Sequence, residues 1–293
     1  MLGLPPLSAE PLITIGSFPV TNAYVNSFLT MVGFVIFAFL INKAVKKYYG
    51  QRMAAPRGLL NFFESLLEML FKYFDQVTGD RKKTIRFLPI VGTLFFFILI
   101  SNWIGLLPGI GSIGIYKVHE GAKEFIPIFR GANADLNMTL AMAILAVVAS
   151  HVLGILTIGF FKYANKFIKL GDLWHAIKSA KPINILIAIV EFFVGLIEVF
   201  SEVAKMVSLS LRLFGNVFAG EVLLTVMASL VAFVVPLPFI ALELLVGLIQ
   251  ATVFAMLTLV YLSIATAEIH GHDQAAHSDL LQDPEHLEPT PTS

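Results

Sequence analysis

The chain has 293 residues, of which 57% are hydrophobic and only 14% are charged, with a mean hydropathy of +0.82. Soluble domains carry about 25% charged residues, so this composition excludes a water-soluble globular enzyme and indicates a membrane protein. The 20 basic and 20 acidic residues balance, and net charge therefore gives no reason to expect a nucleic-acid partner. The chain has no cysteine, which excludes disulfides, thiolate metal sites and cysteine nucleophiles.

Five stretches of the chain are apolar enough to cross a bilayer. A helix needs about 20 mostly apolar residues to span the hydrocarbon core. The sequence therefore predicts an all-α membrane protein with about five transmembrane helices in a single polytopic membrane domain, residues 1–267. The first span should be retained, since the stretch before it carries Glu10 and no basic residue. The expected spans lie near residues 22–42, 87–107, 135–161, 183–235 and 238–267.

An amphipathic helix is predicted between the first two spans, at residues 58–76. Polar side chains recur there every three or four positions against a face of Leu, Phe and Met, which is the helical period. Such a helix either packs on a partner or lies in the membrane interface, and we favour the interface. Its polar residues are Asn61, Glu64, Ser65, Glu68, Lys72, Asp75 and Gln76.

Basic residues are concentrated in two loops. Ten occur at positions 43–86, and five lysines occur at positions 162–181. The positive-inside rule places both loops in the cytoplasm, with the N-terminus and the loop at 117–130 outside. Residues 268–293 are acidic and polar and should form a disordered cytoplasmic tail, where irregularly spaced histidines give no reason to expect a metal site.

Residues 183–235 do not fit an ordinary span. The roughly 52 residues after Pro182 would measure about 78 Å as one helix, far more than the hydrocarbon thickness of about 30 Å. They also carry charges, and a charge in mid-bilayer costs at least about 3 kcal/mol. Two conventional spans joined by a charged turn near 205–212 are one solution, and a single strongly tilted helix is another.

The phase of the polar residues favours the single helix. A turn need not keep helical phase, whereas here one polar stripe continues through the supposed turn. Glu221 lies about 180° from Arg212, so the opposite face carries a carboxylate. At 100° per residue, a sector of about 100° holds Glu191, Glu198, Ser201, Glu202, Lys205, Ser208, Arg212 and Asn216.

Arg212 differs from the other charges in this stripe. Glu198, Glu202 and Lys205 have the spacing of intrahelical ion pairs, and such pairs alone could account for them. No acidic residue stands at those spacings from Arg212. A cation within a membrane needs a counter-charge, so Arg212 is expected to find its partner elsewhere.

Other spans add polar groups. Glu243 and Gln250 are seven positions apart and share a face of the last span. Asp135 and Asn137 open the third span, where they either cap the helix or line an aqueous channel. We interpret His151, in mid-span, as a hydrogen-bonded contact between helices.

The most specific pattern is the run from Ser208 to Asn216, SLSLRLFGN, followed by Ala219, Gly220 and Glu221. It resembles the signature of subunit a of F-type ATP synthases, and the resemblance extends over nearly the whole chain. Weaker matches are FPVTN at 18–22, ADLN at 134–137, and Gln250 followed by Tyr261 and Leu262.

This resemblance implies a fold, partners and a location. The last two helices would form a long, strongly tilted hairpin across a ring of c subunits. The implied partners are that ring, the b subunits of the peripheral stalk, the other ATP synthase subunits and membrane lipid. The chain would be a non-catalytic channel subunit without a cofactor, in a bacterial inner membrane, with its C-terminus in the cytoplasm. No Gly-x4-Gly-Lys-Ser/Thr motif is present, so phosphate chemistry is expected in other subunits.

The resemblance also assigns residues. Arg212 stands where the family's arginine faces the ring, and Glu221 is paired with Glu243 where the family commonly has an acid and a histidine. Lys205 is followed by Met206 where the family often has proline. We expect the two carboxylates to approach each other and share one proton. The expected proton-translocating set is Arg212, Glu221, Glu243, Asn216, Gln250, Ser208 and Glu198, with Asp135 and Asn137 as channel-lining candidates.

A fixed arginine suits this task for a physical reason. A rotor carboxylate crosses lipid only when neutral but must ionise to exchange its proton with water, and a cation between two offset half-channels permits that. The alternative is a proton-coupled secondary transporter in which Arg212 and Glu221 bind an anionic substrate and a proton, although the inverted repeats of that class are not visible. A structural scaffold is the third hypothesis. The coupling ion is expected to be the proton rather than sodium.

Overall fold

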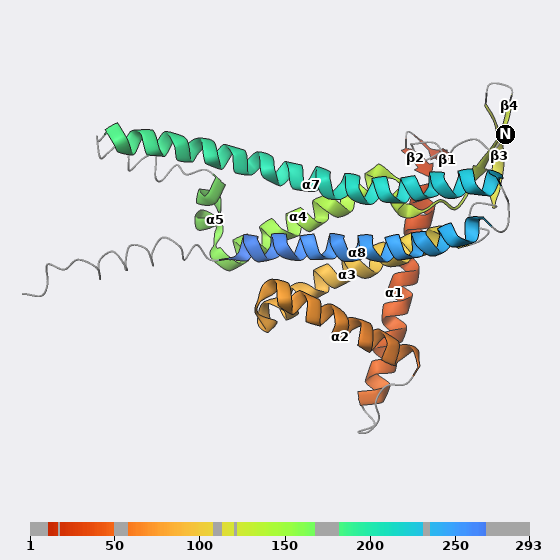
Figure 1. Cartoon of the computed structure of the whole chain (residues 1–293), viewed down its shortest axis with the longest axis horizontal. Coiled ribbons are helices and arrows are strands. Elements are labelled where there is room, and N and C mark those ends of the chain that lie inside the picture. The colour runs from red at the N-terminus through yellow and green to blue at the C-terminus, as the bar shows by residue number, and fades with distance from the viewer. Residues whose placement is uncertain are drawn as a thin grey trace, which may run out of the picture.

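A computed structural model shows a bundle of long helices (Figure 1). The structure describes residues 11–16, 18–49, 58–107, 113–119, 122–167, 182–230 and 235–267. The expected tail at 268–293 lies outside the described residues, as do positions 168–181 of the second basic loop.

Five helices are long and apolar enough to cross a membrane, which confirms the predicted all-α membrane class. They are α1 (Asn22–Tyr49), α3 (Arg81–Gly105), α4 (Leu136–Ile158), α7 (Pro182–Leu230) and α8 (Pro236–Thr266). Three shorter elements accompany them: α2 (Leu59–Thr78), α5 (Phe160–Phe167) and the 3-10 turn η2 (Ala132–Ala134).

Side-chain caps determine where two of the spans begin. Asp80 accepts a hydrogen bond from the backbone N–H of Lys82, and Asp135 accepts one from that of Asn137. Helix α3 therefore begins at Arg81, earlier than the predicted 87, because its charged first turn is absent from any apolar window. Helix α4 ends before Gly159, whose φ of 93° redirects the chain into α5.

Two short β-hairpins were not predicted from the sequence. Strands β1 (Pro11–Ile15) and β2 (Phe18–Thr21) pair antiparallel, as do β3 (Gly114–His119) and β4 (Ala122–Pro127). Both lie toward the same end of the bundle as the connection between α7 and α8 (Figure 1). Strands this short give too little periodic signal to be recognised beside long apolar helices.

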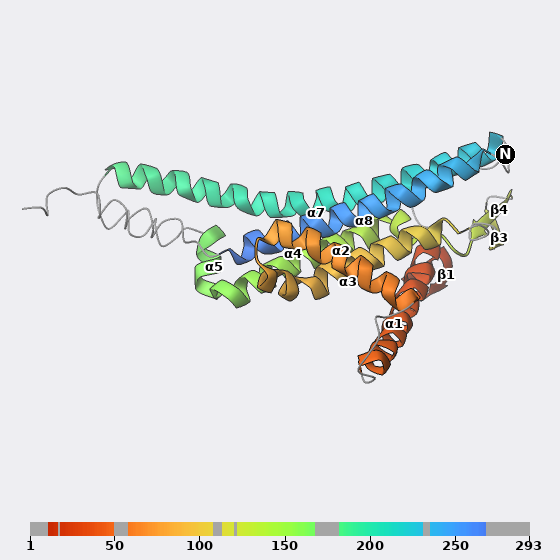
Figure 2. The same ribbon diagram turned by 60° about the horizontal axis from the view of Figure 1, so that its bottom comes forward.

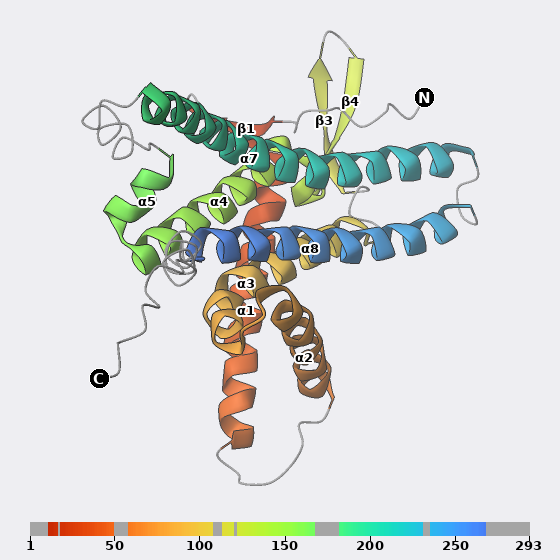
Figure 3. The same cartoon turned by 60° about the vertical axis from the view of Figure 1, so that its left-hand side comes forward.

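Helix α7 is one continuous helix of 49 residues, as the phase of its polar stripe predicted. Helix α8 begins with Pro236 in its first turn, a position where proline is compatible with a helix, and runs back along α7. Helix α1 crosses this hairpin at a steep angle (Figure 3). A bilayer that α1 crosses upright would therefore meet the hairpin at a strong slant, which is the tilt expected for residues 183–235.

The hydrophobic core is built mainly from α3, α4 and α8. Phe95 and Ile98 of α3 and Phe254 and Leu259 of α8 are fully buried in it. Alanines at 251 and 255 of α8 let the helices approach closely. Helix α7 adds Leu209 and Leu213 to this core but leaves most of its large apolar side chains exposed, and it lies along one edge of the bundle (Figure 2).

Helix α2 packs against the bundle through one side only. Leu70 and Phe74 are buried in the core, whereas Phe62, Met69 and Tyr73 are exposed at helical spacing. One face of this amphipathic helix therefore packs on protein, and the other is exposed and available to the membrane interface, so each of the two interpretations applies to a different face. Its junction with α3 is tied by an ion pair between Asp75 and Arg81.

The single helix α7 makes a testable prediction about topology. Five crossings place the two termini on opposite sides of the membrane, whereas two upright spans in place of α7 would make six and place them on the same side. A reporter fused after Ser293 should signal from the cytoplasm, and one fused before Met1 from outside. Reporters that signal from the same compartment would contradict the single crossing.

Candidate functional site

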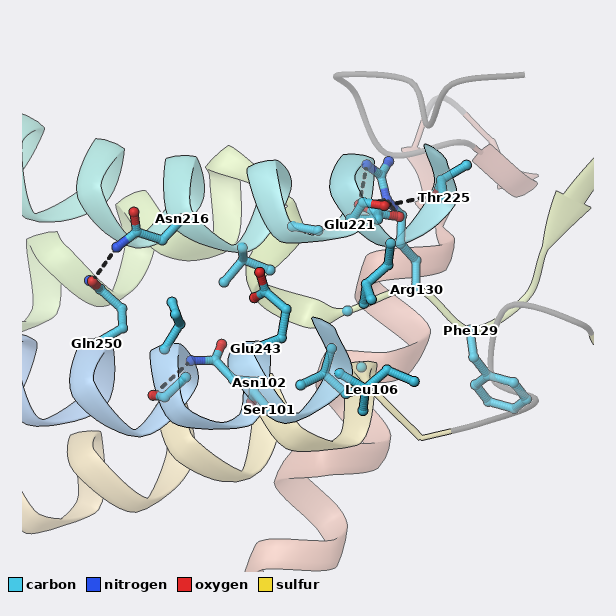
Figure 4. Close-up of a pocket in the computed structure, with 18 of the residues that line it drawn as sticks. Ser101, Asn102, Leu106, Phe129, Arg130, Asn216, Glu221, Thr225, Glu243 and Gln250 are labelled. Atoms are coloured by element: carbon cyan, nitrogen blue, oxygen red, sulfur yellow. Dashed lines mark hydrogen bonds and ion pairs between the residues drawn. The ribbon is translucent and has the colours of Figure 1, made fainter. Parts of the chain in front are cut away.

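A cavity of about 440 Å³ opens between the end of α3, the segment before α4, and the hairpin of α7 and α8 (Figure 4). Most of its lining is apolar, but several polar side chains converge on it. These are Ser101, Asn102, Arg130, Asn216, Glu221, Thr225, Glu243 and Gln250. The cavity is therefore a polar space enclosed by membrane-length helices.

The strongest electrostatic contact in the cavity joins Arg130 to Glu221 of α7. The Nε of Arg130 donates to Oε1 and Oε2 of Glu221 at 3.0 and 3.2 Å, and its Nη2 donates to Oε2 at 2.9 Å. The side chain of Arg130 is only 3% exposed and that of Glu221 29%. This is the fork geometry that makes arginine the preferred partner of a buried carboxylate.

The segment that carries Arg130 is anchored by amide side chains. Asn26 of α1 donates to the backbone oxygen of Arg130 at 2.8 Å, and Asn22 donates to that of Pro127 at 3.2 Å. Asn133 donates to Oδ1 of Asn102 on α3 at 2.7 Å. These bonds tie the segment to two separate helices, so they fix where the guanidinium of Arg130 can reach.

Glu243 of α8 points toward α7 in the middle of the cavity (Figure 4). Its carboxylate lies against the backbone of Gly220, where a Cβ atom would collide with it. Within the described chain, Glu243 forms no hydrogen bond or ion pair. Glu243 thus lies beside the residue that precedes Glu221, whereas the carboxylate of Glu221 is bonded to Arg130, and the expected sharing of a proton between the two carboxylates stays a prediction.

Asn216 and Gln250 link the two hairpin helices beside Glu243. The Nδ2 of Asn216 donates to Oε1 of Gln250 at 2.6 Å. The Nε2 of Gln250 and the Oγ of Ser101 are buried without a partner in the described chain. Such orphaned polar atoms in a polar cavity are the usual positions of bound water.

Arg212 lies one turn from Asn216 on α7 but outside the cavity. Its side chain is exposed, and in the described part of the chain it forms no hydrogen bond or ion pair. Ser208, one turn further, is exposed as well. Arg212 therefore stands on the uncovered face of a membrane-length helix, without a counter-charge from the described residues.

Comparison with known proteins identifies the family of this chain. Residues 25–263 match the family model of the ATP synthase A chain. The chain belongs to the ATP synthase subunit a family. The protein named ATP synthase subunit a of Geobacter sulfurreducens is 31% identical over 249 residues, which cover 85% of this chain and 89% of that protein. Its counterpart of Campylobacter jejuni subsp. doylei is 34% identical over 217 residues, 74% and 80% of the two chains.

A second polar cluster of this chain lies on the N-terminal half of α7, on the other side of Arg212 from the cavity. Lys205 donates to Oε1 of Glu202 at 2.6 Å, and the ammonium lies over the ring of Tyr261 at 5.2 Å. His151 contacts Tyr163, with 2.7 Å between Nδ1 and the hydroxyl oxygen, and its Nε2 is 3.7 Å from Glu202. The helical ion pair and the His151 contact expected from the sequence are both present.

The hydroxyl of Tyr163 keeps its proton in this cluster. Burial, together with the negative charges of Glu202 and Glu198, raises the pKa of Tyr163 to about 12. Glu198 is half-buried and lies on α7, one helical turn before Glu202. The cluster therefore offers a neutral phenol, an imidazole and carboxylates at the end of α7 opposite the cavity.

Asp135 has the role of a helix cap. Its Oδ1 accepts from the N–H of Asn137 at 3.0 Å, and the Asn137 side chain also donates to it, at 3.2 Å. Neither residue lines the cavity. Asp135 therefore caps α4, which is one of the two alternatives expected from the sequence, and a channel-lining role of Asp135 and Asn137 stays a prediction. Among the described residues, no group of three or more His, Asp or Glu side chains could hold a metal ion.

Sequence reasoning missed Arg130, Asn102 and Asn133. One signal was available for Arg130, because a basic residue close to a span on the outer side runs against the positive-inside rule. Its pairing with Glu221, 91 positions away, has no local spacing that could reveal it. The two asparagines lack any sequence signature of this kind.

The contact of the Glu243 carboxylate with the backbone of Gly220 leads to a testable prediction. In Gly220→Ala, the new methyl group would displace the carboxylate of Glu243, which can move because it ends a flexible side chain. We expect an assembled complex whose proton-driven ATP synthesis is slower by about tenfold, since a misplacement of about 1 Å can cost up to a hundredfold. Gly33→Ala on α1 is the control, because nothing lies within 4 Å of the added atom. An unchanged rate of ATP synthesis in Gly220→Ala would show that this contact of Glu243 has no role in proton transfer.

Proposed function

We propose that this chain is the proton-translocating stator subunit of an F-type ATP synthase, in which Arg212 faces a carboxylate of a rotating ring. Membership in the subunit a family supports the general role in the membrane sector. The observation that carries the specific role is the position of Arg212, which is exposed on α7 without a counter-charge from the part of the chain that the structure describes. A cation placed in lipid without a partner is costly, so a second chain must supply one.

The two polar regions on either side of Arg212 are the proposed half-channels. The cavity at Asn216, Glu221, Glu243 and Gln250 is lined also by Pro127 at the end of β4 and by Pro236 at the start of α8, and we place that end of the molecule outside. The cluster around Glu198 and Glu202 lies toward the opposite, cytoplasmic end, with Ser208 between it and Arg212. Along α7, Asn216 lies about 6 Å above Arg212 and Lys205 about 10 Å below it. Neither polar region spans the membrane alone.

This offset couples proton flow to rotation. A ring carboxylate loses its proton into one half-channel, passes Arg212 while ionised, and takes a proton from the other half-channel before returning to lipid. The membrane potential supplies about 2.3 kcal/mol per charge per 100 mV. The remaining partners are the b subunits and the other synthase subunits, which would carry the phosphate chemistry. We place the complex in a bacterial inner membrane, with the N-terminus of this chain outside.

Replacing Arg212 should uncouple the complex without dismantling it. Without Arg212, an ionised ring carboxylate in the membrane would be uncompensated, at a cost of at least about 3 kcal/mol. This cost corresponds to a slowdown of rotation of about a hundredfold or more. Arg212→Ala should therefore neither make ATP from a proton gradient nor pump protons on ATP hydrolysis. Arg212→Lys should fail too, because an ammonium lacks the planar fork and sheds its proton more easily when desolvated. The measurement is ATP-driven proton pumping in membrane vesicles, with subunit content checked by immunoblot.

A structural arginine predicts the reverse pattern, with lost assembly for alanine and near-normal pumping for lysine. Robust pumping by an assembled Arg212→Ala complex would refute the assignment.

A further inference from the structure

The cavity holds two carboxylates with different surroundings. Its charged lining residues are Arg130 from the segment before η2, Glu221 from α7 and Glu243 from α8, while α3 contributes only uncharged polar groups. Glu221 accepts three hydrogen bonds from the Arg130 side chain. Glu243 takes none from the described chain. The sharing of one proton expected from the sequence took no account of a guanidinium beside Glu221.

The position of Arg130 is fixed by the rest of the fold. Its backbone oxygen is held by Asn26, and the adjoining Gly131 lies so close to Gly105 of α3 that a Cβ at position 105 would come within 3.2 Å of it. A guanidinium anchored in this way and 3% exposed cannot follow a proton or turn to water. It compensates the negative charge of Glu221.

Glu243 lies where a mobile proton is needed. It stands between the ion pair of Arg130 and Glu221 on one side and the amide pair of Asn216 and Gln250 on the other (Figure 4). The Nε2 of Gln250 is a buried donor without an acceptor in the described chain, and it belongs to the same cavity. From Asn216, the next turn of α7 carries Arg212.

We propose that Arg130 is a positioning residue that holds Glu221 as a fixed carboxylate, so that Glu243 is the group that takes up and passes on the proton in the outer cavity. The proton enters at the Glu243 carboxyl, leaves toward the amide pair of Asn216 and Gln250, and reaches the ring carboxylate beside Arg212. Glu221 neutralises Arg130 and keeps that cation from repelling the incoming proton. This assignment rests on the proposed function of the chain.

The test compares single and double substitutions in the complete complex, in membrane vesicles stripped of the catalytic sector so that passive proton conduction is measured. Glu221→Gln leaves the cation of Arg130 uncompensated beside the path and should slow conduction by about tenfold or more. Adding Arg130→Met to Glu221→Gln removes both charges and should restore most of that loss. Glu243→Gln should block conduction, and adding Arg130→Met to it should restore nothing. Glu68→Gln on the exposed side of α2 is the matched control for a Glu to Gln change.

The rescue distinguishes the roles. If Arg130 is merely structural, or if Glu221 itself carries the proton, the double substitution of Arg130 and Glu221 should conduct protons no faster than Glu221→Gln alone. That outcome overturns the proposal. Normal conduction by Glu243→Gln also overturns it. If Glu221→Gln does not assemble, the double substitution is compared directly with Glu243→Gln, and it must be the faster of the two.

The same vesicles separate this proposal from the function on which it rests. Before stripping, ATP-driven pumping by the wild type and its loss in Arg212→Ala test the proposed function. If those two controls behave as expected and the rescue is absent, only the division of labour between Glu221 and Glu243 fails.

Discussion

A charge within a membrane must be compensated, and this requirement organises the polar architecture of the chain. Transfer of an unpaired charge to the bilayer centre costs at least about 3 kcal/mol, so the charged side chains along α7 either find a partner in this chain or lie where another molecule supplies one. Glu221 pairs with Arg130, and Lys205 pairs with Glu202. Arg212 has no such partner in the described chain, and it lies on the face of α7 that this chain leaves uncovered. The position of the missing partner is thereby defined.

Compensation of Glu221 depends on elements that are distant in sequence. The guanidinium comes from the segment before η2, that segment is held by asparagines of α1 and by Asn102 of α3, and the carboxylate comes from α7. Each amide side chain satisfies a backbone or side-chain acceptor that would otherwise be buried without a partner. The ion pair therefore joins the hairpin to the rest of the bundle at its outer end. At the other end, the contact of His151 with Glu202 joins α4 to α7 in the same way.

Local patterns predicted those features that depend on helical period, and they failed where pairing is long-range. The continuity of α7 followed from a polar stripe with unbroken phase, and the five spans followed from apolar length. The hydrogen bond between Asn216 and Gln250 fits their expected place on facing helices. Arg130 could not be paired with Glu221 from sequence, because the contact depends on where a loop is anchored in three dimensions. The β-hairpins were missed because strands this short carry almost no periodic signal.

Arg130 and Arg212 differ in whether their guanidinium groups are already paired with a carboxylate. Arg130 is buried and its fork is occupied by Glu221, which compensates its charge. Arg212 is exposed with its fork open, so an approaching carboxylate gains the full interaction there. On α7 the guanidinium of Arg212 is therefore open to a carboxylate of another molecule, whereas the guanidinium of Arg130, on the segment before η2, is already engaged by Glu221. Under the proposed function, this difference between the two arginines confines the ionised state of a passing ring carboxylate to the position of Arg212.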